Sequence, residues 1–257
     1  MLRNESHSGL DSWDAHTVSN DMNGQTVVLI GGSAGIGLET ARLARSAGAD
    51  VILTGRNPDP LEAAAADIGA QRTAAFDAND AHALEQFFEA LPAPIDHVLV
   101  TAGGPRYGPM LEMDIADVRD ALSGHAVLAL QVARYARSRM RPGGTLVLMG
   151  GTGGRRIDHR LGIVPAATAT LPPFTAALAL ELAPIRVNLI AAGFVDTPLS
   201  ASLLGDQLDN RRKELTSTLP IGRVVTSQDV AALAVHLMVN TALTGATYDI
   251  DGGQQFV

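Results

Sequence analysis

The stretch that decides the fold is Gly31-Gly32-Ser33-Ala34-Gly35-Ile36-Gly37, which follows the apolar run Thr26–Ile30 and leads into a segment of helical period, Gly35–Ala47. Glycines between a strand and a helix allow a tight turn, let backbone N–H groups approach a pyrophosphate, and let the helix pack closely on the strand. The placement indicates a dinucleotide-binding turn, and a glycine-rich turn without a ligand is the simpler alternative.

The rest of the chain repeats this alternation of short apolar runs and longer Ala- and Leu-rich segments, a pattern typical of a parallel sheet covered by helices on both faces. The expected strands are Thr26–Ile30, Asp50–Leu53, Arg72–Phe76, His97–Val100, Thr145–Leu148, Arg186–Ile190 and Thr247–Ile250. The expected helices are Gly35–Ala47, Pro60–Ile68, Ala81–Ala90, Ile115–Met140, Phe174–Leu182 and Ser227–Val239. No linker-like change in composition divides the chain. The sequence therefore predicts a single-domain α/β Rossmann fold with a doubly wound, parallel seven-stranded sheet.

Two segments fall outside this pattern. Residues 1–23 are rich in Ser, Asp, Asn and His and lack the apolar core of a secretory signal, so we expect a flexible N-terminal extension before a cofactor-binding domain at residues 24–257. The polar stretch Pro198–Leu219 is expected to be a lid-like insertion over the site, with an ordinary pair of surface helices as the alternative.

Composition limits the partners. The 257 residues carry 19 basic and 27 acidic side chains, a formal charge of −8, and no long basic run, which argues against nucleic acid and anionic membranes. The chain has no cysteine and no H-x-x-x-H spacing, so we expect no disulfide, no thiolate nucleophile and no metal site. The apolar stretches are shorter than the roughly 20 residues of a membrane span. We expect a cytoplasmic protein that acts on a small molecule.

The spacing of Gly31, Gly35 and Gly37 resembles the glycine motif of the short-chain dehydrogenase/reductase (SDR) family. Further landmarks of that family follow in order along the chain: Asp77, Thr101-Ala102-Gly103, Val187-Asn188, Ala192-Gly193 with Thr197, and Asp251-Gly252-Gly253. The resemblance implies an oxidoreductase that assembles as a homodimer or homotetramer on its two long central helices. It implies that the nicotinamide cofactor is bound by Gly31, Ser33, Gly35, Ile36, Gly37, Arg56, Asp77, Ala78, Thr101, Ala102, Gly103, Gly193, Val195 and Thr197.

The end of the second strand indicates which cofactor is used. NAD-specific Rossmann sites hold the adenosine ribose with an Asp or Glu about 20 residues past the glycines. Here the strand ends Leu53-Thr54-Gly55-Arg56, with no carboxylate and with an arginine that can pair with a 2′-phosphate. The sequence favours NADP(H) over NAD(H), unless Arg56 is only a solvated loop residue.

The resemblance breaks down at the catalytic positions. SDR reductases use a Tyr as the acid, a Lys four residues later, a Ser that orients the carbonyl and an Asn that completes a proton relay. The resemblance assigns these four positions to Val164, Thr168, Gly151 and Ser123, in that order. All four are substituted, and a small alignment shift does not help, because the tyrosines are Tyr107, Tyr135 and Tyr248 and the only lysine is Lys213.

The segment around the missing pair is also altered. Pro172 and Pro173 are tolerated only in the first turn of a helix, so we expect the regular helix to begin near them and the preceding residues, Arg155 to Leu171, to be irregular.

Other residues are candidates for the missing proton donor. His159, with Asp158 or a neighbouring arginine, and Tyr107, beside Arg106, follow strands whose carboxyl ends form the ligand-binding edge of such sheets. Solvated loop charges are the alternative. His125, two residues from Ser123 on the same expected helix, points away from that face and is interpreted as structural.

Three functions stay open. The first is an NADP(H)-dependent oxidoreductase with an atypical or missing proton donor. The second is a catalytically inactive NADP(H)-binding sensor or scaffold. The third is a lyase, isomerase or cyclase that keeps the fold and its pocket without hydride transfer.

Overall fold

The chain forms one parallel seven-stranded sheet. The computed structural model describes residues 21–155, 157 and 161–257. The strand order is β3-β2-β1-β4-β5-β6-β9, and every neighbouring pair is parallel. The strands are β1 (Thr26–Ile30), β2 (Asp50–Gly55), β3 (Arg72–Ala75), β4 (Ile95–Val100), β5 (Met140–Gly151), β6 (Arg186–Ala192) and β9 (Thr247–Ile250). The predicted doubly wound Rossmann fold is confirmed.

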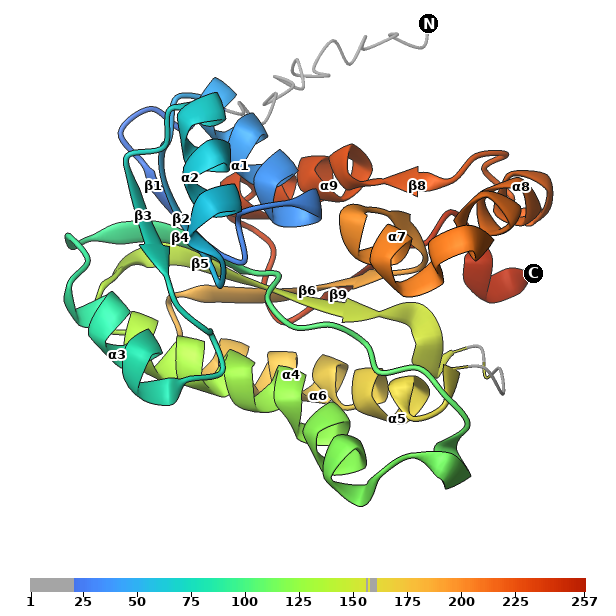
Figure 1. Ribbon diagram of the computed structural model, residues 1–257. Coiled ribbons are helices and arrows are strands. Elements are labelled where there is room, and N and C mark those ends of the chain that lie inside the picture. The colour runs from blue at the N-terminus through green and yellow to red at the C-terminus, as the bar shows by residue number, and fades with distance from the viewer. Residues whose placement is uncertain (1–20, 156, 158–160) are drawn as a thin grey trace, which may run out of the picture.

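Helices cover both faces of the sheet (Figure 1). One face carries α1 (Gly35–Ser46), α2 (Pro58–Ile68) and α9 (Ser227–Val239), and the other carries α3 (Ala81–Glu89), α4 (Ile115–Ala136) and α6 (Leu171–Glu181). The direction of the strand order reverses between β1 and β4. In open α/β sheets, ligands bind outside the carboxyl ends of the strands at this reversal. The topology therefore predicts where the site lies.

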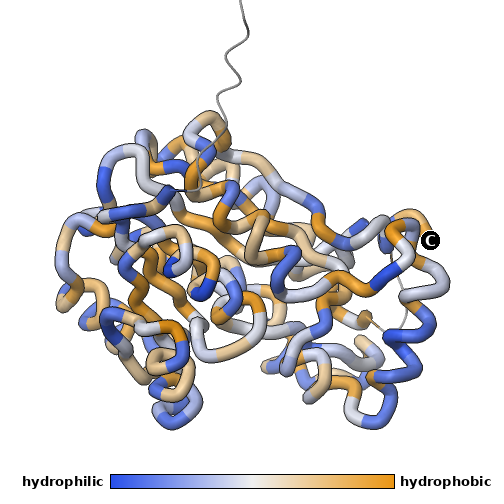
Figure 2. Tube along the Cα trace, turned by 90° about the horizontal axis from the view of Figure 1, so that it is seen from above, coloured by the Kyte–Doolittle hydropathy of each residue, from blue (hydrophilic) through white to orange (hydrophobic). Residues whose placement is uncertain are grey.

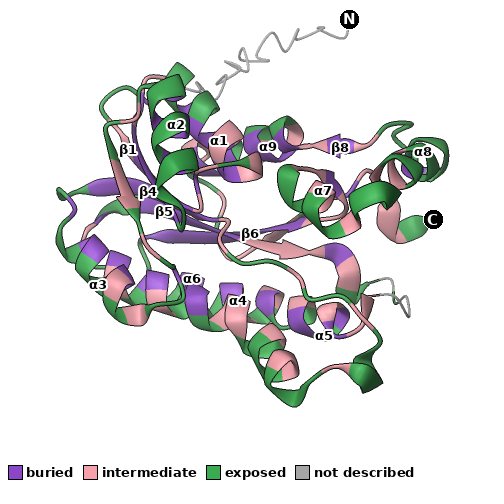
Figure 3. Cartoon of the chain, in the orientation of Figure 1, coloured by how far each residue is buried: buried purple, intermediate pink, exposed green. Residues whose placement is uncertain are grey.

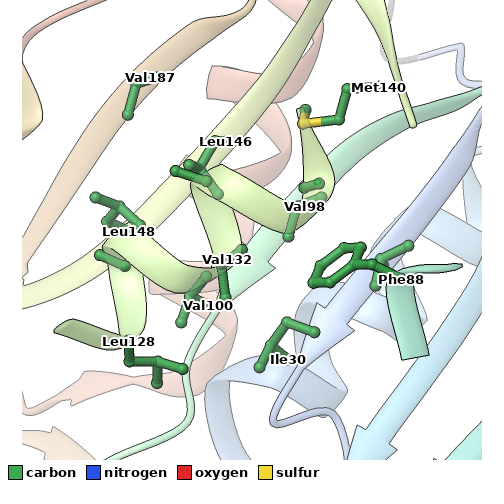
Figure 4. Close-up of a cluster of buried hydrophobic side chains, with 14 of the residues drawn as sticks. Ile30, Phe88, Val98, Val100, Leu128, Val132, Met140, Leu146, Leu148 and Val187 are labelled. Carbon is green, nitrogen blue, oxygen red and sulfur yellow. The ribbon is translucent and has the colours of Figure 1, made fainter. Parts of the chain in front are cut away.

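The sheet is buried because its strands are apolar on both faces, as expected for parallel strands between two helical layers (Figure 3). The close-up in Figure 4 shows one of the two resulting cores, where Phe88 of α3 and Leu128 and Val132 of α4 lie among side chains of the strands, including Ile30 and Val98. These five residues are at most 3% exposed, so the sheet that carries the site has a tightly packed base.

A buried arginine joins the last helix to the sheet. Arg186 begins β6, and its guanidinium donates to backbone oxygens at the end of α9 and just beyond it, those of Leu237 at 2.8 Å, Met238 at 2.7 Å, Asn240 at 3.0 Å and Leu243 at 3.1 Å. The last carbonyls of a helix have no partner within the helix and carry partial negative charge. The arginine therefore satisfies these acceptors and is stabilised by them, although burial lowers its pKa.

Several predicted boundaries are wrong. The helix expected at Ile115–Met140 ends at Ala136, and β5 already begins at Met140, where the Ile95 amide donates to the Arg139 oxygen at 2.8 Å. This contact starts the pairing of β4 with β5 earlier than the apolar runs indicate. The helical period of this stretch does not distinguish the last helical turn from the turn into the strand.

The segment before the paired prolines is more regular than predicted. A short 3-10 turn, η2 (Thr152–Gly154), follows β5, and Val164–Ala169 forms a helix, α5, within the range expected to be irregular. Pro172 and Pro173 lie in the first turn of α6, as predicted, since the N–H groups they lack have no acceptor within the helix there. A helix therefore exists on both sides of Thr170.

The folded domain begins before Gly24. Met22 is fully buried, its amide donates to the Ala47 oxygen at 2.8 Å, and its own oxygen accepts from the Gln25 amide at 3.0 Å. The prediction of a flexible extension to residue 23 is therefore wrong for residues 21–23, because Met22 packs into the core between the sheet and α1. Residues 1–20 lie outside the described part of the chain.

The segment predicted as a lid consists of two helices, α7 (Pro198–Leu204) and α8 (Leu208–Thr218), joined by the turn η4 (Gly205–Gln207). Short strands β7 (Val195–Asp196) and β8 (Val225–Thr226) pair on either side of it and were not predicted. These helices lie at the carboxyl end of the sheet in Figure 1, above it, with α5 and the 3-10 turn η1 (Met110–Glu112) below. α8 is the strongly hydrophilic stretch near the C-terminus in Figure 2, and the chain ends in the turn η5 (Gln254–Phe256).

Candidate active site

The glycine turn after β1 is packed so tightly that side chains do not fit. A Cβ added at Gly37 would lie 2.1 Å from the Gly31 oxygen, and one added at Gly31, which has φ +105°, would lie 2.7 Å from the Ala102 amide nitrogen. The Thr101 hydroxyl donates to the Gly31 oxygen at 2.7 Å. We call Gly31, Gly35, Gly37 and Thr101 the glycine cradle. It holds the start of α1 at the carboxyl edge, where unpaired helical N–H groups bind anions.

The other side of the cradle is formed by the segment after β6. A Cβ added at Gly35 would lie 3.6 Å from Thr197, so the start of α1 and the start of α7 lie side by side. Thr197 accepts a hydrogen bond from the Ser200 amide at 3.1 Å and thereby caps α7. Gly193 packs against Asp251, whose Cβ would lie 2.6 Å from a Cβ on Gly193. The predicted cofactor residues that follow β1, β4 and β6 are therefore brought together at one edge.

The ends of β2 and β3 carry the residues expected to bind the adenosine half. Arg56 follows β2 and is exposed, and within the described residues its guanidinium has no hydrogen-bond or ion-pair partner. Ser33 lies beside it, since a Cβ on Gly55 would be 3.2 Å from the Ser33 hydroxyl. Asp77 is exposed and holds its own turn by accepting from the Asn79 amide at 2.9 Å. An unpaired cation beside a glycine turn fits a 2′-phosphate.

Two residues of α4, Ser123 and His125, have different surroundings. Ser123 is exposed and its hydroxyl donates to the Arg119 oxygen of the same helix at 2.7 Å. His125 instead points to the site, because a Cβ added at Gly103 would lie 3.5 Å from its Nε2 atom. The interpretation of His125 as merely structural did not predict this approach, since the direction in which the face points cannot be read from helical spacing.

The positions predicted to replace the catalytic Ser, Tyr and Lys do come together. A Cβ on Gly151 would lie 3.3 Å from the Thr168 methyl group, and one on Gly153 would lie 3.5 Å from Val164. The Thr168 hydroxyl donates to the Val164 oxygen at 2.9 Å, within its own helix. Neither Val164 nor Thr168 carries a group that titrates near neutral pH, and Gly151 has no side chain.

A cavity of about 210 Å³ adjoins this corner. Its lining is mostly small or apolar, with one charged group, Arg155, which forms an ion pair with Asp249 of β9. The lining residues are Gly151, Gly154, Arg155, Thr168, Ala169, Pro172, Leu189 and Ala191.

Of the two predicted proton donors, the structure describes only Tyr107. Its side chain is 51% exposed, and partial burial raises the pKa of the phenol while the nearby Arg211 guanidinium of α8 acts in the opposite direction. Arg211 also lies 6.0 Å from the ring centre of Phe194, which follows β6. Loops after β4 and β6 thus meet α8 over the carboxyl edge. His159 and Asp158 lie outside the described residues.

In the described part of the chain, the acidic and histidine side chains do not gather into a metal site. Within residues 21–155, 157 and 161–257, no three of them lie close enough together to hold an ion. In the same part of the chain no helix is long and apolar enough to cross a membrane.

Comparisons with known proteins identify the class. A family model described as enoyl-(acyl carrier protein) reductase matches residues 31–255. The chain therefore belongs to the SDR family of oxidoreductases, as the resemblance predicted.

Individual relatives cover nearly the whole chain. The chain is 30% identical to a human 3-oxoacyl-[acyl-carrier-protein] reductase over 89% of its own length and 97% of that protein. It is 29% identical to carbonyl reductase family member 4 of Xenopus tropicalis over 88% of its own length and 96% of that protein. A solved small-chain dehydrogenase in complex with NADPH is 26% identical, with a TM-score of 0.78 over 91% of this chain and 99% of that one.

Proposed function

We propose that the chain is a cytoplasmic, NADP(H)-dependent oxidoreductase that transfers a hydride between the nicotinamide and a small carbonyl or alcohol substrate, with a proton donor other than the usual Tyr–Lys pair. The observation that carries the proposal is the glycine cradle beside the unpartnered guanidinium of Arg56. A Cβ at Gly37 would lie 2.1 Å from a backbone oxygen, so the cradle excludes side chains where a pyrophosphate must approach. The NADPH bound by one solved relative supports the same cofactor.

Each half of the proposed site has a separate task. When bound, NADPH supplies the hydride for the substrate carbonyl. The amides at the start of α1 face the pyrophosphate, and Arg56 pairs with the 2′-phosphate by charge-assisted hydrogen bonds. Asp77 and Ala78 flank the adenine, and Thr101 to Gly103 together with Gly193, Val195 and Thr197 hold the nicotinamide half. These residues fix orientation, which is a large part of catalysis by itself.

The proposed substitutions at Ser123, Gly151, Val164 and Thr168 remove the family's usual groups for proton delivery and carbonyl activation. Positioned acid–base catalysis contributes about 10²–10⁴-fold to rate. We expect generic ketones to be reduced at least that much more slowly than by relatives with the full set. A Gly151→Ser, Val164→Tyr, Thr168→Lys variant is a direct test, because Gly151 and Thr168 already lie in contact.

Replacing Arg56 tests the choice of cofactor. Arg56→Ala should weaken NADPH binding by about 1.5–3 kcal/mol, as expected for lost hydrogen bonds to a charged group, while NADH binding is unchanged. Fluorescence titration with both cofactors measures the difference. Arg137→Ala is a matched control, because Arg137 is exposed at the far end of α4. An equal loss for both cofactors would show that Arg56 acts through folding.

A turnover assay separates this function from its competitors. NADPH absorbance is followed with a panel of ketones, aldehydes and quinones while cofactor binding is titrated independently. Binding with turnover supports the oxidoreductase. Binding without turnover favours the sensor or scaffold, or a non-redox lyase or isomerase, and both alternatives draw their support from the missing Tyr-x-x-x-Lys pair. Failure to bind would reject the proposed cofactor.

The proposed dimer or tetramer uses apolar side chains that the single chain leaves exposed on its two central helices. Leu122, Val127 and Leu130 of α4 are 39–47% exposed, and Leu180 of α6 is 82% exposed. Burying such groups favours association. Light scattering that detects a monomer would reject this assembly.

The helices α7 and α8 are proposed to act as a substrate lid. Arg212 of α8 pairs with both carboxylate oxygens of Asp196 in β7, at 2.8 and 2.9 Å. This ion pair attaches α8 to β7, so the rest of the segment can move about this point. Hydrogen exchange in 198–219 should slow when NADPH and a substrate bind together. Unchanged exchange would favour the alternative of an ordinary surface helix pair.

A further inference from the structure

We infer that His125 is the group that exchanges the proton with the substrate oxygen at this site. The inference rests on the proposed function, because it concerns the proton that accompanies hydride transfer. It differs from the sequence-based candidates, Tyr107 and His159, and from the family's usual donor.

The position of His125 carries the argument. Its Nε2 atom would lie 3.5 Å from a Cβ on Gly103, and Gly103 has φ +105° at the end of the motif that follows β4. The ring therefore lies next to the backbone that is proposed to hold the nicotinamide half of the cofactor. It reaches this edge from the middle of α4, a long helix whose neighbouring residues Leu128 and Ala129 are buried in the core. A ring held by such a helix has a fixed direction.

A small cavity touches the same ring. It measures about 10 Å³ and is lined by Val100, Ala102, His125, Leu128, Ala129, Leu148, Met149 and Leu171. This volume is at the lower limit for one water molecule, and the lining is apolar apart from His125. Within the described residues, His125 has no hydrogen-bond partner, which leaves both ring nitrogens available.

The described residues that line the small cavity beside His125 are uncharged. The residues that share the cavity with it come from β4, β5, α4 and α6 and from the turn after β4, and none of those described is ionisable. Arg106, in the turn after β4, forms an ion pair with Asp117 at 3.0 Å. Burial among apolar groups lowers the pKa of His125. At neutral pH the ring is therefore mostly neutral and, when protonated, is a stronger acid than an exposed histidine.

The step balances. In reduction, the carbonyl carbon gains the hydride of NADPH, the carbonyl oxygen takes the proton of the His125 imidazolium, and the neutral ring, which is partly exposed, recovers a proton from solvent. The net change is NADPH, one proton and a carbonyl giving NADP⁺ and an alcohol. In oxidation, the neutral ring accepts the alcohol proton. Reduction should therefore slow as pH rises above the pKa of His125, and oxidation should speed up until it reaches that pKa.

The first measurement does not depend on turnover. The histidine ring signals of the full chain are titrated by NMR without cofactor, with NADP⁺ and with NADPH, and His125→Gln identifies the signal. The expected pKa lies below the ordinary histidine value and falls further with NADP⁺ than with NADPH, because the oxidised ring is positively charged. His236, exposed at the end of α9, serves as the matched control and should not respond. A His125 pKa that is the same with either cofactor overturns the inference.

The second measurement is the pH profile of NADPH oxidation with the carbonyl panel. His125→Gln should lower kcat by about 10²–10⁴-fold and abolish the decline of about tenfold per pH unit above the His125 pKa. His236→Gln, at the exposed end of α9, should leave both unchanged. Turnover with an unaltered pH profile in His125→Gln overturns the inference and leaves the proposed function intact. If no carbonyl oxidises bound NADPH, the proposed function fails, and the inference fails with it.

Discussion

The glycines on the two sides of the carboxyl edge serve different purposes. At Gly37, an added Cβ would lie 2.1 Å from the Gly31 oxygen, which is backbone and cannot move aside. At Gly151, which has an extended backbone with φ −144°, the nearest obstacle is the Thr168 methyl group at 3.3 Å, and a side chain can shift. The proposed cofactor side is fixed by backbone sterics, whereas the proposed catalytic corner is bounded by a side chain that can shift.

The largest loss of stability and of NADPH binding is expected from a substitution in the glycine cradle. Gly37→Ala forces a Cβ against the Gly31 oxygen and the Thr101 hydroxyl, at 2.1 and 2.8 Å, so the first turn of α1 must move. Overpacking of this kind costs up to about 3 kcal/mol of unfolding free energy. Urea denaturation and NADPH titration measure the two consequences.

We expect NADPH binding to be lost even where the variant still folds. A Gly37→Ala chain that binds NADPH like the parent would show that the turn is not sterically fixed. The contrast with the catalytic corner would then disappear.

Acid is expected to lower the stability of the fold through a histidine in β4, away from the proposed site. Burial lowers the pKa of His97 in β4 to about 3, and its Nε2 atom contacts the Gln25 amide oxygen at 2.7 Å. The unfolded chain binds a proton near the ordinary histidine pKa of about 6.5, and the folded chain does not until pH falls to about 3. Stability is therefore full above about pH 6.5 and declines towards pH 3 by up to about 1.4 kcal/mol per pH unit.

Chemical denaturation at several pH values between these limits measures the slope. His97→Gln should flatten it, and His82→Gln, at an exposed position of α3, should not. A slope that persists in His97→Gln would assign the acid sensitivity to other groups.

The smallest change in stability is expected from a substitution at Gly151, in the proposed catalytic corner. Gly151→Ala requires the Thr168 methyl group to yield by a few tenths of an ångström, and alanine tolerates the extended backbone. We expect a change within about 0.5 kcal/mol, as for substitutions away from strained positions. Thermal and urea denaturation measure it. A loss as large as that of Gly37→Ala would mean that both sides of the edge are equally rigid.

The part of the site that was predictable from sequence is the part that backbone geometry requires. The cradle at Gly31 and Gly37 could be predicted because only glycine fits between strand, helix and the turn at Thr101. The approach of His125 to Gly103 could not, because it depends on how α4 is rotated against the sheet, and helical spacing does not fix that rotation. The helix α5 was missed for a related reason: its apolar residues pack against α4 and the turn after β5, and such tertiary contacts override the local signal of Pro172 and Pro173.

The buried Arg186 bears on the order in which the chain folds during synthesis. Its guanidinium is paired by carbonyl groups that lie 51 to 57 residues later in the chain. Until the ribosome has released those residues, β6 can enter the sheet only by burying a charge whose acceptors are limited to the Gly143 oxygen and the Thr145 hydroxyl, which is unfavourable. The early strands, β1 to β4, meet no such obstacle, and domains fold from the N-terminus as they emerge. The sheet should therefore form in two stages, with β1 to β4 first and β6 joining them only when α9 is complete.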